Sequence, residues 1–100
     1  MLRIYGSPLC GDCRSAMANF DRNNIEYEFY DIGQSLRRLS EFLKYRDTEP
    51  CFDKWKAIDD ICIPCIVDDE TGEVFIEWEN YLEGKGMSVE LGDGPACSII

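Results

Sequence analysis

The chain has 100 residues, of which 45% are hydrophobic and 12% aromatic, so it can form one small domain with its own core. The 20 acidic residues outnumber the 10 basic ones and give a formal net charge of -10. This charge argues against nucleic acid or an anionic membrane surface as the partner and favours a basic or neutral one. Histidine is absent, which excludes histidine-dependent triads and Cys-His zinc sites.

The N-terminal residues lack the basic segment and long apolar region of a secretory signal, and no apolar run is long enough to span a bilayer. We therefore interpret the six cysteines as thiols of a protein in the reducing cytoplasm. A secreted disulfide framework is the less favoured interpretation, because the apolar content suffices for a core without such crosslinks.

The first thirty residues predict a strand, a helix and a second strand. Residues 2–5 are rich in apolar side chains and run into a turn at residues 6–8. From residue 11 to about residue 22, apolar residues recur at i, i+3, i+4 and i+7, which indicates one face of a helix. Residues 25–30 alternate between apolar and acidic, as in a half-buried strand. The two strands should pair in parallel through a right-handed crossover.

Further along, Ser35 is a plausible N-cap for a helix that extends to about Tyr45. Pro50 opens a short amphipathic segment of one or two helical turns. Residues 63–67 and 73–77 predict a hairpin with a glycine in its loop.

A last helix is expected to begin at Trp78 and to end at Gly84. The order of elements predicts an α/β fold of the thioredoxin type, with a mixed four-stranded sheet flanked by helices. We expect residues 1–84 to form the domain and residues 85–100 to form a glycine-rich C-terminal extension.

Two cysteines, Cys10 and Cys13, stand at the predicted start of the first helix. A thiol reacts as its thiolate, and the unpaired N–H groups and partial positive charge of a helix start favour that anion. Cys10 is therefore a candidate nucleophile. Cys13, one turn further on, should be less exposed and close enough to attack a mixed disulfide formed on Cys10. The alternative is a pair of ordinary buried cysteines.

The stretch Tyr5-Gly6-Ser7-Pro8-Leu9-Cys10-Gly11-Asp12-Cys13, followed about fifty residues later by Ile63-Pro64, resembles the glutaredoxins. The resemblance covers roughly residues 1–83. It implies a dithiol oxidoreductase in which Cys10 is the nucleophile and Cys13 the resolving thiol. It also implies that the Ile63-Pro64 bond is cis and lies beside the cysteine pair, an uncommon and specific expectation. The implied substrate-binding residues are Leu9, Gly11, Asp12, Ile63 and Pro64.

In this family the substrates are disulfide-containing proteins or glutathione mixed disulfides. The resemblance implies glutathione or a system of the thioredoxin-reductase type as reductant, with no tightly bound cofactor, and we expect a monomer. The chain departs from the family pattern at Ser7, where many glutaredoxins carry a basic residue, and at Trp78, where they carry a Gly-Gly pair. Both features help to hold glutathione carboxylates, so the sequence leaves glutathione dependence open.

The sign of the pKa shift of Cys10 also stays open at this point. By Coulomb's law Asp12 opposes a thiolate at Cys10, whereas Arg14 and the helix start favour it.

A second Cys-X-X-Cys motif at Cys62 and Cys65 allows a different function. Together with Cys10 and Cys13, these residues could bind zinc or an iron-sulfur cluster, although a strand alternates its side chains and Pro64 stiffens the second motif. Otherwise Cys62 and Cys65 belong to the core, as we expect for Cys51. A third alternative is a redox-sensing interaction domain that forms the disulfide without passing electrons onward. The C-terminal Cys97-Ser98-Ile99-Ile100 has the form of a prenylation box, but its terminal isoleucine and acidic flank argue against lipidation.

Overall fold

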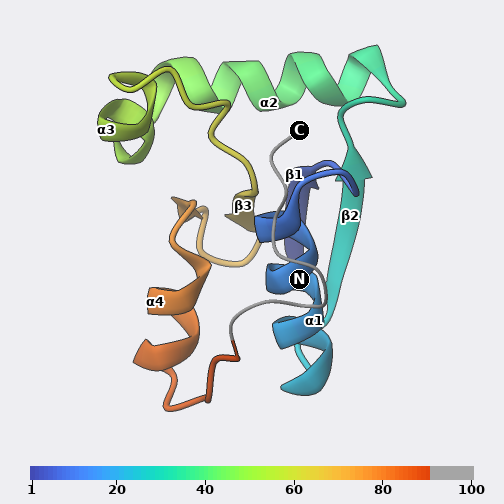
Figure 1. Cartoon of the computed structure of the whole chain (residues 1–100), viewed down its shortest axis with the longest axis vertical. Helices are drawn as coiled ribbons and strands as arrows, with labels where there is room; N and C mark the ends of the chain where they lie inside the picture. Colours follow the sequence, from blue (N-terminus) through green and yellow to red (C-terminus); the bar gives the residue numbers. More distant parts are fainter. Residues whose placement is uncertain (91–100) are drawn as a thin grey trace.

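A computed structural model describes residues 1–90 of the chain. At its centre lies a four-stranded sheet in the order β2-β1-β3-β4 (Figure 1). Strand β1 (Leu2–Gly6) pairs in parallel with β2 (Tyr27–Asp31) and antiparallel with β3 (Cys65–Asp68). Strand β3 pairs antiparallel with the short edge strand β4 (Val74–Phe75). The mixed sheet confirms the predicted α/β fold of the thioredoxin type.

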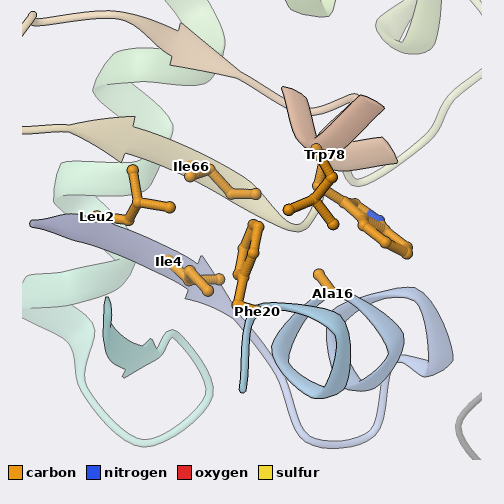
Figure 2. Close-up of a cluster of buried hydrophobic side chains, with 7 residues drawn as sticks. Leu2, Ile4, Ala16, Phe20, Ile66 and Trp78 are labelled. Carbon is orange, nitrogen blue, oxygen red and sulfur yellow. The ribbon is translucent and has the colours of Figure 1, made fainter. Parts of the chain in front are cut away.

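Helices α1 (Gly11–Arg22) and α4 (Trp78–Gly84) share one face of the sheet. Side chains alternate along a strand, so Ile4 of β1 and Ile66 of β3 point to this face. Figure 2 shows Phe20 of α1 reaching up to these isoleucines and to Trp78 of α4. All these side chains are almost fully buried, so hydrophobic packing holds the two helices against the central strands.

The opposite face is covered by α2 (Leu36–Thr48), a 3-10 turn η1 (Pro50–Phe52) and the short helix α3 (Asp53–Lys56). The alternate residues of the same strands, among them Tyr5 and Val67, pack there against Phe42 and Phe52. Helix α2 lies across the top of the view in Figure 1. The described part of the chain contains no helix long and apolar enough to cross a membrane.

Helix α1 has the predicted bounds, and Ser35 caps α2 by accepting a hydrogen bond from the Arg38 backbone N–H at 3.2 Å. The expected strand over residues 25–30 begins later, at Tyr27. Ile25, the first residue of the expected strand, is instead bound to the last turn of α1. Its backbone N–H donates to the carbonyl of Phe20 at 2.9 Å. Asn24 has a positive φ of 58°, which turns the chain before it can pair with β1.

The predicted hairpin is present but its strands are shorter. Strand β3 begins at Cys65 instead of residue 63, because Cys62 has a positive φ of 76° and the Ile63-Pro64 bond is cis. Strand β4 covers two residues instead of residues 73–77. It ends early because the Trp78 backbone N–H donates to the carbonyl of Ile76, and α4 then begins. The loop glycine, Gly72, has a positive φ of 78°.

Packing continues past the expected domain boundary at residue 84. Met87 and Val89 are partly buried against the face that carries α1 and α4. The side chain of Asn19 accepts from the Glu90 backbone N–H and donates to its carbonyl, both at 2.8 Å. The rest of the expected extension, including the terminal motif at Cys97, lies outside the described residues.

Candidate active site

Cys10 occupies the N-cap position of α1, directly after the turn that follows β1. The turn is closed by the Cys10 backbone N–H, which donates to the carbonyl of Ser7 at 3.1 Å. The Sγ atom of Cys10 accepts a hydrogen bond from the backbone N–H of Cys13 at 3.3 Å. A cysteine sulfur thus stands where a serine or aspartate oxygen usually caps a helix, and the backbone offers its donors to this atom.

Cys13 lies beneath Cys10 and has no solvent exposure. Its sulfur fits against β1 only because residue 6 is a glycine. A Cβ atom at Gly6 would lie 2.7 Å from the Cys13 Sγ, closer than real Cβ contacts allow. The prediction that Cys13 is the less exposed thiol of the pair is therefore confirmed, since Cys10 is half-buried.

The site lowers the pKa of Cys10 from 9.0 to about 6. The largest cause is the hydrogen bond from the Cys13 thiol; burial of Cys10 opposes it, and the backbone N–H groups of Cys13 and Asp12 lower the pKa further. The Asp12 carboxylate raises it, as Coulomb's law predicts. The same thiol hydrogen bond, together with burial, raises the pKa of Cys13 far above its ordinary value. At neutral pH Cys10 is therefore the thiolate and Cys13 the thiol.

The Ile63-Pro64 peptide bond is cis, which confirms the expectation drawn from the family resemblance. Pro64 is fully buried and Ile63 is half-buried. A pocket of about 380 Å³ has both Ile63 and Asp12 in its wall, so the loop before β3 and the start of α1 border one cavity. Leu9, directly before Cys10, is 75% exposed and does not line this pocket, whereas Gly11 is buried within the first turn of the helix.

Several residues of this pocket were not anticipated as parts of a site. The remaining wall is formed by Trp55, Asp60, Ile76, Glu77, Glu79 and Asn80. The indole N–H of Trp78 donates to Oδ1 of Asp12 at 3.0 Å, which anchors the variable part of the Cys-X-X-Cys motif to α4. From the sequence, this segment was predicted only to begin the last helix, and its acidic residues were counted only in the net charge of the chain.

Burial raises the pKa of Asp12, the hydrogen bond from Trp78 lowers it, and repulsion from Asp60 raises it. Burial likewise raises the pKa of Glu79, and Asp12 and Glu77 add to this by repulsion. The carboxylates of the pocket are thus close enough to interact electrostatically.

The second cysteine motif belongs to the other face of the sheet. Cys62 and Cys65 are buried in the cluster below α2, and Cys51 packs against the same cluster. Burial raises the pKa of Cys65 above its ordinary range, so it is held as a neutral thiol. Among residues 1–90, no three or more cysteine, aspartate or glutamate side chains are grouped so that they could hold a metal ion. The alternative of a four-cysteine site with Cys10 and Cys13 is therefore not supported by the geometry.

Comparison with known proteins places these features in a family. The family model for glutaredoxin matches residues 2–51, which include β1, the cysteine pair and α2. An uncharacterized protein of Haemophilus influenzae is 30% identical over 64 residues, which cover 64% of this chain and 74% of that protein. No solved structure matches the chain. With the fold, the cysteine pair and the cis proline, the family match shows that the chain belongs to the glutaredoxin family.

Proposed function

We propose that the protein is a thiol-disulfide oxidoreductase with Cys10 as nucleophile and Cys13 as resolving thiol. The observation that carries this proposal is the capping of α1 by the Cys10 sulfur, with its pKa lowered to about 6. The membership of the glutaredoxin family supports the same class of chemistry. A surface cysteine with an ordinary pKa would be mostly protonated at neutral pH, whereas this one is ready to attack.

In the first step the Cys10 thiolate attacks one sulfur of a substrate disulfide. A bond forms between Cys10 Sγ and that sulfur, the substrate S–S bond breaks, and the other substrate sulfur leaves as a thiolate. In the second step Cys13, as thiolate, attacks Cys10 Sγ and releases the second substrate thiolate. The substrate gains two electrons and the protein holds a Cys10-Cys13 disulfide, which an external dithiol or two molecules of a monothiol such as glutathione would reduce again.

The second step requires Cys13 to lose its proton despite its raised pKa. The largest cause of that rise is its hydrogen bond to Cys10. Once the Cys10 sulfur is bonded to substrate it carries no charge, so the Cys13 thiol loses the acceptor that stabilised its protonated form. A hydrogen bond from the Ser7 backbone, which lowers the pKa of Cys13, remains. Mixed-disulfide formation thus favours the release of the proton that resolution needs.

The proposed substrate contacts are the residues around the pocket mouth. Exposed Leu9, directly before Cys10, and half-buried Ile63 in the pocket wall offer apolar surface to a substrate. Because residues 62–64 lie outside the strand β3, the backbone of Ile63 is available to pair with an extended substrate segment. Pro64 has no N–H of its own to compete for that pairing. Gly11 and Asp12 contribute the first turn of α1.

The test is reduction of an insulin-type protein disulfide and of a glutathione mixed disulfide, with and without added glutathione. We expect Cys10→Ser to abolish both activities, and Cys13→Ser to abolish protein-disulfide turnover and to trap a mixed disulfide on Cys10. Cys51→Ser is the matched control, since this half-buried thiol donates only a long hydrogen bond to the Val74 carbonyl. Unchanged reduction in the Cys10 variant would refute the proposal. A disulfide that forms in the wild type without turnover would favour the redox-sensing alternative.

A further inference from the structure

The acidic pocket beside Cys10 points to a substrate class. Resting on the proposed oxidoreductase function, we propose that the protein selects disulfides flanked by a lysine or arginine in a peptide segment, whose cationic side chain enters this pocket. Anionic disulfides, glutathione mixed disulfides among them, are then poor substrates.

The pocket joins carboxylates from three separate segments of the chain. Asp12 comes from the start of α1, Asp60 from the loop after α3, and Glu77 and Glu79 from the start of α4. None of the residues in its wall is a lysine or arginine. Its volume of about 380 Å³ is within the range of ligand pockets and can accept a long side chain. The position of Asp12, two residues after Cys10, places this negative field next to the reacting sulfur.

Cationic side chains of the chain itself lie at the edge of the pocket. The Arg46 guanidinium donates to the backbone carbonyl of Asp60 at 2.8 Å, without pairing with its carboxylate. The Lys54 ammonium lies 3.1 Å from Oε2 of Glu77 and 5.2 Å from the centre of the Trp55 ring. Among the described residues, Asp12, Asp60 and Glu79 form no ion pair. Lys54 thus illustrates how an ammonium group fits between a carboxylate and an aromatic face at this edge. The carboxylates that form no ion pair remain for a substrate to neutralise.

A peptide fits the pocket better than a simple amine. The wall includes half-buried Trp55, whose ring offers a face against which the apolar stem of a lysine or arginine side chain can pack. Ile63 and Ile76 in the wall, and exposed Leu9 directly before Cys10, add apolar groups that a peptide can contact and a simple amine cannot. Glutathione carries more carboxylates than ammonium groups, so the pocket repels it.

The test compares three peptides that each contain one disulfide and differ only in the flanking residue, which is lysine, glutamine or glutamate. Single-turnover reduction by the dithiol protein is stopped with acid and quantified by chromatography. At low salt we expect the lysine peptide to react about five- to tenfold faster than the glutamine peptide, and the glutamate peptide to react slowest. Added salt should reduce these ratios.

A pair of variants separates the pocket from the overall acidity of the protein. In the double variant Asp60→Asn with Glu79→Gln, the ratio of lysine-peptide to glutamine-peptide rates should fall toward one. Glu26→Gln is the control, because this exposed carboxylate lies directly before β2, at the far end of the sheet from Cys10. It removes a negative charge and should leave the ratio unchanged.

The outcomes distinguish this inference from the proposed function. Equal Cys10-dependent rates for all three peptides, or a ratio that falls as much in Glu26→Gln as in the double variant, would overturn the inference alone. If no peptide is reduced, the oxidoreductase function fails, and binding decides the inference separately. For this, redox-inert peptides with serine in place of cysteine are titrated and followed by NMR. Chemical-shift changes of the backbone amides in the pocket with the lysine peptide only would support the inference. Equal chemical-shift changes with all three peptides would overturn it.

Discussion

The reactivity of Cys10 should depend on the thiol of Cys13 more than on any other group. The pKa of Cys10 falls from 9.0 to about 6, and the Cys13 thiol is the largest of three lowering interactions that together also overcome burial and Asp12. This thiol alone must therefore lower the pKa by more than about one pH unit. At pH 7 about nine-tenths of wild-type Cys10 is thiolate. In Cys13→Ala the thiolate fraction of Cys10 at this pH should fall below about one half.

The assay is the rate of Cys10 alkylation by iodoacetamide as a function of pH, read by mass spectrometry of the peptide that contains Cys10. The wild-type midpoint should lie near pH 6. Cys13→Ala should move it upward by more than about one unit, and Cys13→Ser, whose hydroxyl can still donate, should lie between the two. Cys51→Ser should leave the midpoint in place. A wild-type midpoint near the ordinary thiol value, or no change in Cys13→Ala, would refute the assignment of the low pKa to the pair.

Two further predictions concern stability. Gly6→Ala should lower the free energy of unfolding by about 1–3 kcal/mol and slow the resolution of the mixed disulfide, because its Cβ would displace the Cys13 sulfur. The control is Gly84→Ala, whose Cβ meets nothing within 4 Å. Equal denaturant midpoints for the two variants would contradict the packing argument. In the reduced protein the unfolded state binds the Cys10 proton up to about pH 9 and the folded state only up to about pH 6. The free energy of unfolding should therefore rise with pH across this window, and Cys10→Ser should remove that rise in urea titrations.

The fold was predictable because its elements obey local rules. Helix α1 shows a clean apolar period, and Ser35 caps α2 as serine commonly does. The ends of the strands were not predictable in the same way, since they depend on tertiary hydrogen bonds, such as that from Ile25 to the carbonyl of Phe20. The positive φ of Cys62 is likewise rare for a residue other than glycine, and a local pattern does not reveal it.

The cysteine pair could be recognised from the sequence because it is a contiguous motif at a predicted helix start. The cis proline was expected only because the resemblance to the glutaredoxins implies it. The acidic pocket could not be recognised in the same way, because its wall is assembled from segments between Asp12 and Asn80, 68 residues apart. Asp60 and Glu79 each have an ordinary local interpretation as surface charges at helix ends. Only the fold shows that they lie around the same cavity as Asp12.

Negative charge in the pocket favours a cationic substrate but disfavours the thiolate of Cys10, and in the structure different groups act on the two. The Asp12 carboxylate that would attract a cation also raises the pKa of Cys10. Its charge is opposed at short range by hydrogen bonds from the Cys13 thiol and from backbone N–H groups, which act directly on the sulfur. The indole of Trp78 holds Asp12 toward α4, on the pocket side of the helix. A bound cation would neutralise Asp12 and so favour the Cys10 thiolate further, which couples recognition of a basic substrate to activation of the nucleophile.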